Sequence, residues 1–127
     1  MNRSRRFYLG AAAFAALAAG APRAVLAAAP DMADNPFAQP SALPLQAPPF
    51  DRIKDTDYQP AIEEGMRQQL AEIDAIANDP APPTFENTLV AMEKSGRMLD
   101  RVTSAFYAVV QANTNPTLDK VQTDEAP

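Results

Sequence analysis

The sequence contains no cysteine and no histidine. Without cysteine, the chain can form neither a disulfide framework nor a thiolate metal site. Without histidine, it lacks the commonest metal ligand and the commonest general base. Between Thr84 and Asn113 no plausible nucleophile stands beside a base either. We assign no catalytic, no cofactor-binding and no metal-binding residue to this chain.

Glycine is scarce and proline is abundant, with 4 and 13 residues respectively in a chain of 127. A chain of this length has room for one small domain at most. Most of the prolines fall between Pro22 and Pro83. They leave less chain for regular structure than the length suggests, because each proline removes a backbone donor and fixes φ.

Positive charge is scarce after the first 29 residues. Four of the 11 basic residues precede residue 30, and none of the 16 acidic residues does. The rest of the chain therefore carries 7 basic and 16 acidic residues, a net charge of −9. So acidic a chain is not expected to bind nucleic acid, because such binding depends on neutralising phosphates with basic side chains.

Residues 1–29 have the three regions of a signal peptide. Three arginines near the start precede a weakly apolar run, Tyr8 to Ala21, and a tail of mostly small residues at 25–29. That order is typical of a secretory signal. Cleavage after Ala27 is favoured; cleavage after Ala29 is the alternative, and Pro30 would follow it. We therefore expect export to the periplasm.

The start of this segment resembles a twin-arginine signal. Arg5 and Arg6 follow a serine and precede Phe7-Tyr8-Leu9, which matches the twin-arginine pattern. We expect the twin-arginine export machinery as a partner; the alternative is an ordinary secretory signal with a chance arginine pair. The apolar run is shorter than a span of about 20 residues requires, so no membrane anchor is predicted.

Residues 30–54 form a proline-rich arm that we expect to be extended, because proline biases the preceding residue away from helix. Two interpretations are open. The arm is either a flexible linker, or it lies on a larger body and inserts Phe37 and Phe50 into it. Large apolar side chains are unusual in linkers.

The first helix is predicted to begin near Asp55 to Asp57, with Asp55 or Thr56 as its N-cap. Glu63 and Arg67 are spaced to pair on its polar face. The apolar positions recur every three or four residues, as on one face of a helix. They are Tyr58, Ile62, Met66, Leu70, Ile73 and Ala77.

The longest proline-free periodic segment runs from Thr84 to Asn113, with Thr84 as the predicted N-cap. Gly96 falls on its apolar stripe and marks either a kink or a close crossing of another helix. The stripe consists of Phe85, Leu89, Met92, Gly96, Leu99, Val102, Phe106, Val109 and Val110.

A third helix is expected after Asn115, with Pro116 in its first turn. It carries Leu118 and Val121, and we expect that its apolar face is not yet buried where the sequence stops at Pro127. Residues 55–127 thus read as about two and a half helices of an incomplete all-α lobe.

The remaining polar and aromatic residues have ordinary interpretations. We expect Glu63, Glu64, Glu72 and Asp74 to lie on solvated helix faces. Tyr58 and Tyr107 are expected in the core or in a wall. Met66, Met92 and Met98 are expected to serve as packing residues.

Several segments between Asn35 and Pro127 resemble the start of bacterial peptidyl-dipeptidases, in the thimet-oligopeptidase-like family of zinc metallopeptidases. They are Asn35-Pro36-Phe37, Pro40-Ser41-Ala42-Leu43-Pro44, Ala47-Pro48-Pro49-Phe50-Asp51, Asp57-Tyr58-Gln59-Pro60-Ala61, Pro83-Thr84-Phe85-Glu86-Asn87-Thr88 and Gln111-Ala112-Asn113-Thr114-Asn115.

The resemblance implies the N-terminal helical lobe of a larger, mostly helical enzyme, where it walls a deep channel that admits short unstructured peptides. Such an enzyme removes dipeptides from peptide C-termini. Zinc is its cofactor, held partly by H-E-x-x-H on a later helix. That motif cannot occur in a chain without histidine, so we expect this chain alone to be inactive and the sequence to be a fragment.

The competing hypothesis is a small exported helical binding module without enzymatic activity. It would use its two apolar stripes to hold a partner.

Overall fold

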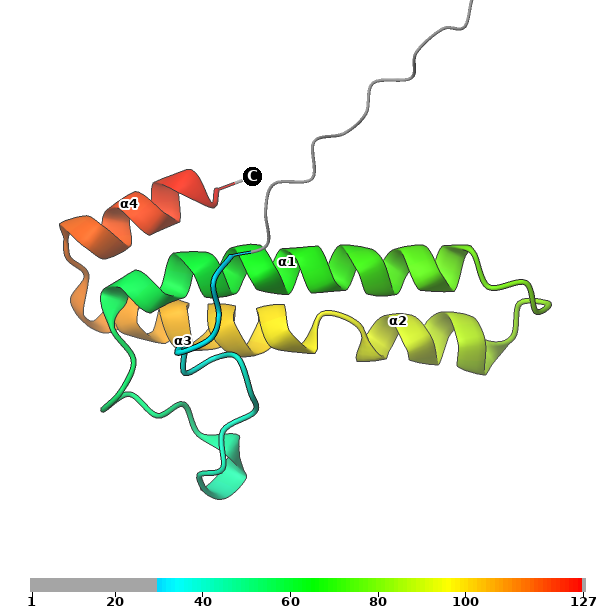
Figure 1. The fold of residues 1–127 in the computed structure, drawn as a ribbon, viewed down its shortest axis with the longest axis horizontal. Helices are drawn as coiled ribbons and strands as arrows, with labels where there is room; N and C mark the ends of the chain where they lie inside the picture. Colours follow the sequence, from blue (N-terminus) through cyan, green and yellow to red (C-terminus); the bar gives the residue numbers. More distant parts are fainter. Residues whose placement is uncertain (1–29, 127) are drawn as a thin grey trace, which may run out of the picture.

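The computed structural model describes residues 30–126, and within this range the protein is helical with no strand (Figure 1). The elements are a 3₁₀ turn η1 (Pro44–Gln46), α1 (Asp55–Ala77), a π-helical segment η2 (Phe85–Val90), α2 (Ala91–Lys94), α3 (Arg97–Asn113) and α4 (Pro116–Asp124). The all-α prediction is confirmed for these residues. The predicted signal peptide, residues 1–29, lies outside them. No helix in the described part is long and apolar enough to cross a membrane.

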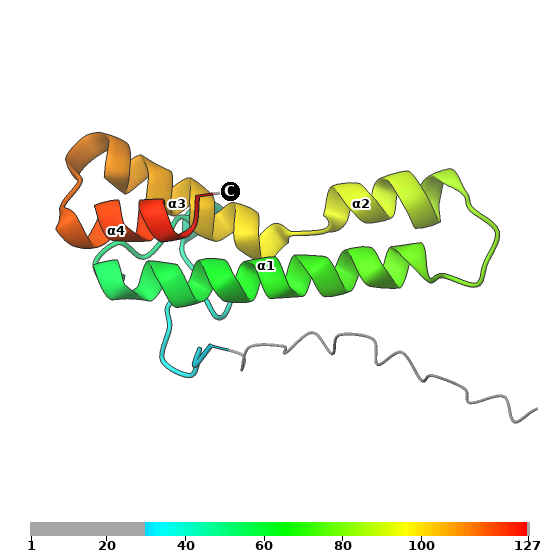
Figure 2. The same cartoon turned by 90° about the horizontal axis from the view of Figure 1, so that it is seen from above.

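The helices form an antiparallel hairpin with a short fourth helix beside it. α1 runs the length of the molecule, and α2 and α3 return along it (Figure 1). Seen from above, α4 lies next to α1 and α3 at one end (Figure 2). With 23 residues, α1 is the longest helix described. Thr84 to Asn113 is not one helix, so that part of the prediction is wrong.

The first turn of α1 is capped differently from the prediction. Lys54, not Asp55 or Thr56, occupies the N-cap position. The Lys54 backbone N–H donates to the Asp57 carboxylate at 2.8 Å. A carboxylate in the first turn accepts an otherwise unpaired N–H and also faces the positive end of the helix dipole. Pro60 lies inside the helix as its sixth residue, where proline removes one i→i−4 hydrogen bond.

α1 and α3 approach each other closely at Gly65. A Cβ atom at Gly65 would lie 2.8 Å from the Leu99 Cα and 3.1 Å from the Leu99 Cβ. Real carbon atoms do not come this close to backbone, so only glycine permits the observed spacing of the two helices. The close crossing that the sequence analysis left open for Gly96 therefore occurs at Gly65.

We expect the Gly65→Ala variant to be less stable by about 1–3 kcal/mol, because the added methyl forces α1 away from α3. Urea denaturation followed by circular dichroism measures the change. Ala71→Met, which adds bulk at an exposed position of the same helix, is the matched control. Equal midpoints for the two variants would contradict the tight crossing.

Gly96 divides the returning half of the hairpin into two helices, α2 and α3. Its φ of 71° lies in the left-handed region, which glycine adopts without strain. Its N–H donates to the Glu72 side chain of α1 at 2.7 Å, and a Cβ here would lie 2.6 Å from Gln69 Nε2. Of the two readings of Gly96, the kink is confirmed, and α1 side chains fill the space in front of it.

The segment before this break begins as predicted but buries little. Thr84 caps it: its hydroxyl accepts the Asn87 N–H at 3.1 Å, and the Asn87 side chain accepts the Thr84 N–H at 2.6 Å. Phe85, Leu89 and Met92 are nevertheless exposed. This half of the predicted apolar stripe is therefore not covered by the described residues.

In α1, too, one part of the predicted apolar stripe is buried and the other part is exposed. Tyr58 and Ile62 are buried, whereas Met66, Leu70 and Ile73 are exposed. The hydrophobic core thus occupies only the end of the hairpin where the arm, α3 and α4 meet. Its buried members are Phe37, Tyr58, Ala61, Ile62, Met98, Val102, Ala105, Phe106, Leu118 and Val121.

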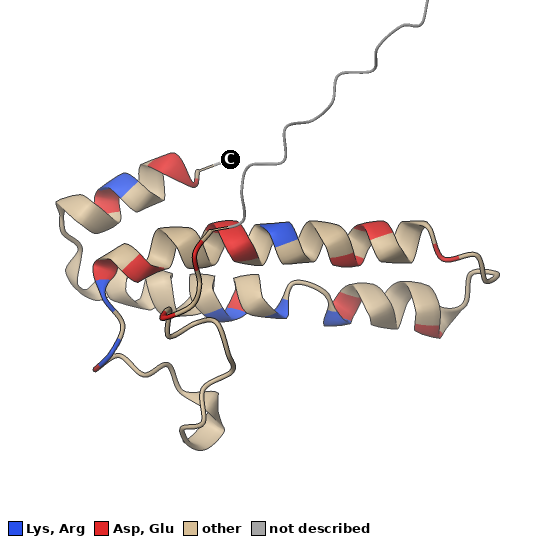
Figure 3. Cartoon of the chain, viewed as in Figure 1, with Lys and Arg blue, Asp and Glu red and all other residues tan. Residues whose placement is uncertain are grey.

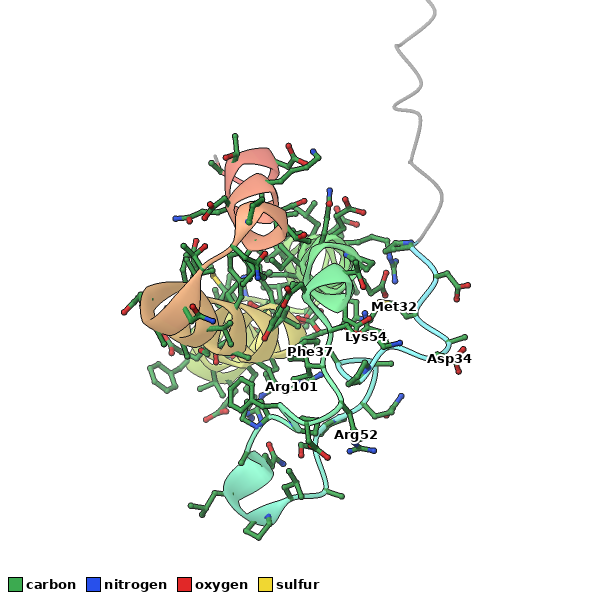
Figure 4. All side chains as sticks on the ribbon, turned by 90° about the vertical axis from the view of Figure 1, so that its left-hand side faces the viewer. Met32, Asp34, Phe37, Arg52, Lys54 and Arg101 are labelled. Carbon is green, nitrogen blue, oxygen red and sulfur yellow. The ribbon has the colours of Figure 1, made fainter. Side chains whose placement is uncertain are left out.

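The arm belongs to this core through Phe37, which is 2% exposed. The Asn35 side chain donates to the Asp57 backbone carbonyl at 2.8 Å, and Arg101 Nη2 donates to the Phe37 carbonyl at 3.0 Å. In the end-on view, Phe37 and Arg101 lie together where the arm meets the helices (Figure 4). The docked-arm interpretation is confirmed for Phe37.

The rest of the arm differs from the prediction. Phe50 is 52% exposed and is not inserted into the body. Backbone hydrogen bonds from Asn35 to Met32 and from Ala38 to Asn35 fold the start of the arm into turns, and η1 adds another. The arm therefore consists of consecutive turns with some extended residues between them, and Phe37 anchors it in the core.

α4 starts at the predicted residues, and its apolar face is buried more completely than predicted. The Asn115 side chain accepts the Thr117 and Leu118 N–H groups at 2.9 and 3.1 Å, with Pro116 in the first turn. Leu118 and Val121 are both buried. The expectation that this helix leaves its apolar face uncovered is wrong, because α4 folds back onto α1.

Candidate functional site

The aromatic cluster at the centre of the core is structural. Tyr58 stacks against Phe37 and Phe106, with ring centroids 5.5 and 5.3 Å apart. Burial, with smaller effects from Asp55 and Asp57, raises the pKa of the Tyr58 hydroxyl. Tyr107 is half-exposed and lies edge-on to Phe106. The prediction of a core or wall role holds for Tyr58, and Tyr107 lies at the surface.

Glu64 is the one buried charged residue of the described chain, with 8% of its surface exposed. Arg67 donates to it twice, at 2.6 and 2.7 Å, and Gln68 Nε2 donates at 2.7 Å. The hydrogen bond from Arg67 lowers the pKa of Glu64 to about 2, against the opposing effect of burial. The solvated face predicted for Glu64 is wrong, and Arg67 pairs with Glu64 rather than with Glu63.

This pair gives the fold a pH dependence with a definite sign. Because the pKa of Glu64 is lower in the folded chain, its contribution to stability is present above the unfolded value of 4.5 and is lost as pH falls toward about 2. We expect Glu64→Gln to flatten the loss of melting temperature between neutral and acidic pH. Glu63→Gln is the control on the adjacent exposed residue. Identical pH profiles for the two variants would contradict the assignment.

The other carboxylates weighed in the sequence have local structural partners. Glu72 accepts the Gly96 N–H, and Asp74 accepts the Asn78 side-chain amide at 2.9 Å. Neither lies beside a nucleophile. Figure 3 shows acidic positions spread along the ribbons of α1 and α4, with basic positions between them.

The described residues do not fit a zinc site. Between residues 30 and 126 there is no group of three or more histidine, cysteine, aspartate or glutamate side chains arranged to hold a metal ion. Zinc sites in proteins use three or four such ligands, mostly histidine or cysteine.

An open groove of about 510 Å³ lies between the arm and the start of the hairpin. Its walls are mostly apolar, and its polar side chains are Asp55 and Asn113 beside the Tyr58 ring. Asp55 accepts a hydrogen bond from the Asn115 amide at 2.8 Å, so it is already engaged. The groove can hold an apolar group, and Tyr58 is the hydroxyl-bearing residue of its lining. The apolar walls are Phe50, Ile53, Ala108, Val109 and Ala112.

The burial of Glu64 and the close helix packing at Gly65 were not predicted from the sequence. The spacing of Glu64 to Arg67 and Gln68 was a signal for a paired carboxylate, since residues three and four apart meet on a helix. A glycine inside a helix was a signal for close packing. Both signals depend on which face of α1 meets α3, which the sequence pattern alone left undefined.

The described residues therefore form a helical hairpin with its own small core. No model of a known protein family matches the chain. Two curated proteins do match it. Dipeptidyl carboxypeptidase of Salmonella typhimurium is 55% identical over 95 residues, which cover 75% of this chain and 14% of that protein. Dipeptidyl carboxypeptidase of Escherichia coli is 51% identical over 87 residues, 68% of this chain and 13% of that protein.

The matched segment is thus homologous to part of the dipeptidyl carboxypeptidases. The family resemblance that the sequence motifs indicated is confirmed. The chain spans about one seventh of the length of these relatives.

Proposed function

We propose that this chain is a wall segment of an exported peptidase that releases dipeptides from the carboxyl end of short, unstructured peptides. The identity of 55% over 95 residues to a dipeptidyl carboxypeptidase carries the proposal. The helical hairpin supports it, because a wall needs shape and stability rather than reactive groups. In this proposal the chain alone is inactive. The zinc ion of the whole enzyme is held by residues outside this sequence.

A chimaera tests the proposal. The 95 matched residues of the Salmonella enzyme are replaced by the matching residues of this chain. We expect the chimaera to release dipeptides from a short peptide at a rate within about tenfold of the parent enzyme, a loss of less than about 1.4 kcal/mol in transition-state stabilisation. A chimaera that folds but releases no dipeptide would overturn the proposed function.

Export belongs to the same proposal and has its own test. Residues 1–29 fused to a reporter should direct it to the periplasm through the twin-arginine route. Replacing Arg5 and Arg6 by Lys should abolish export, whereas replacing Arg3 and Arg23 by Lys should leave it intact. Export that survives the Arg5 and Arg6 replacements would favour the ordinary secretory signal.

The binding-module alternative is favoured by one observation. The chain has a core of its own, and α4 completes it by burying Leu118 and Val121. An autonomous module needs such a core. The chimaera separates the two functions, since a module unrelated to peptidase action would not sustain dipeptide release.

A further inference from the structure

The end of the hairpin remote from the arm carries an apolar surface that the described chain leaves uncovered. We call it the tip face and define it by Leu70 and Ile73 of α1, Leu89 of η2 and Met92 of α2. These side chains are 69%, 39%, 55% and 52% exposed, respectively. The core lies at the opposite end, so nothing within residues 30–126 covers them.

The four residues lie on two neighbouring segments, α1 and η2–α2, at the same end of the hairpin. Ile73 and Met92 line the same open groove of about 370 Å³ between α1 and the η2–α2 segment. Leu70 lies three residues before Ile73, and Leu89 lies three residues before Met92. Residues at this spacing are neighbours on a helix surface. An exposed apolar patch built from two helices indicates a contact surface rather than scattered surface leucines.

The chemistry of the groove defines what fits it. Its lining includes Ile76, Ala77, Ala81 and Pro83, and Asp79 is its only charged residue. The occupant is therefore apolar. A second copy of this chain is disfavoured, because residues 30–127 carry a net charge of −9 and like-charged bodies repel.

The geometry points to further polypeptide of the same peptidase as the occupant of the tip face, an inference that rests on the proposed function. Homologues at 51–55% identity are about seven times as long as the matched segment. An apolar helix face from that additional chain would bury the tip face and form a second core beside the first. The α1–α3–α4 end would then fold by itself, and the tip would order fully on docking.

Methionine oxidation tests the docking in the 127-residue chain and in the chimaera, with Met98 as an internal reference that is 7% exposed. Peroxide oxidises methionine according to its exposure. We expect Met92 to react rapidly in the 127-residue chain and roughly tenfold more slowly in the chimaera. Met98 should react slowly in both.

Each outcome decides the inference. Equal rates for Met92 in the two proteins would overturn it, whether or not the chimaera is active. Protected Met92 in a folded but inactive chimaera would uphold the docking and overturn the proposed function. Protection in the 127-residue chain that disappears on dilution would replace the inference with self-association. A chimaera that does not fold would overturn both.

A paired substitution gives a second readout. Leu70→Gln with Leu89→Gln should leave the melting temperature of the 127-residue chain unchanged and lower that of the chimaera. Leu43→Gln with Leu45→Gln, on the exposed part of the arm, is the matched control and should change neither. A tip variant that behaves like this control in the chimaera would contradict docking.

Discussion

Replacing Phe37 by Ala should destabilise the chain by about 3–5 kcal/mol, the range for deleting a buried aromatic ring. Phe37 is fully enclosed and stacks on Tyr58 at 5.5 Å. Its loss leaves a cavity under the arm and weakens the Arg101 hydrogen bond to the Phe37 carbonyl. A small domain has only about 5–15 kcal/mol of total stability, so the arm and the helices should loosen together. Urea denaturation followed by circular dichroism measures this loss.

Phe50 provides a control of the same residue type in the same arm. Because Phe50 is 52% exposed, Phe50→Ala should change the free energy of unfolding by less than about 0.5 kcal/mol. The difference between the two variants separates a docked arm from a linker. Equal denaturation midpoints would show that the arm does not contribute to the core.

Replacing Leu118 by Ala should cost about 2–5 kcal/mol, because it deletes a fully buried leucine of α4. Leu118 has no exposed surface and packs in the cluster with Tyr58 and Phe106. The same measurement should show a shifted urea midpoint, with α4 amides losing hydrogen-exchange protection first. Helices this short hold their shape mainly by packing.

Leu70→Ala is the control for this variant. It makes the same deletion at a side chain that is 69% exposed, so we expect a change below about 0.5 kcal/mol in the 127-residue chain. A Leu118 variant as stable as the Leu70 variant would mean that α4 does not pack on α1. The binding-module alternative would then lose the observation that favours it.

The helix starts could be predicted from sequence because they depend on neighbours within a few residues. Thr84 and Asn115 cap their helices with side-chain oxygens, as the residue types indicated. The start of α1 was predicted less accurately. The Asp57 carboxylate, inside the first turn, accepts the Lys54 N–H, and Lys54 is the N-cap residue. Local hydrogen bonding explains both the successes and this error.

Burial could not be predicted as well, because periodicity shows which residues share a face and not what covers that face. Tyr58 and Leu70 lie on the same predicted stripe, yet one is buried and the other exposed. Phe37 and Phe50 were equally good candidates for insertion, and only Phe37 meets Tyr58. These outcomes depend on contacts between residues far apart in the chain.

The sequence by itself determined the helical class, the capped starts at Thr84 and Asn115, and the lack of histidine and cysteine. Composition and local hydrogen bonding are properties of the sequence itself. Only the tertiary structure decided that Gly65 carries the close crossing, that Gly96 turns left-handed against Glu72, and that the core fills one end of the hairpin. The physical reason is that these features require two distant segments to meet, and a periodic pattern does not say which segments do.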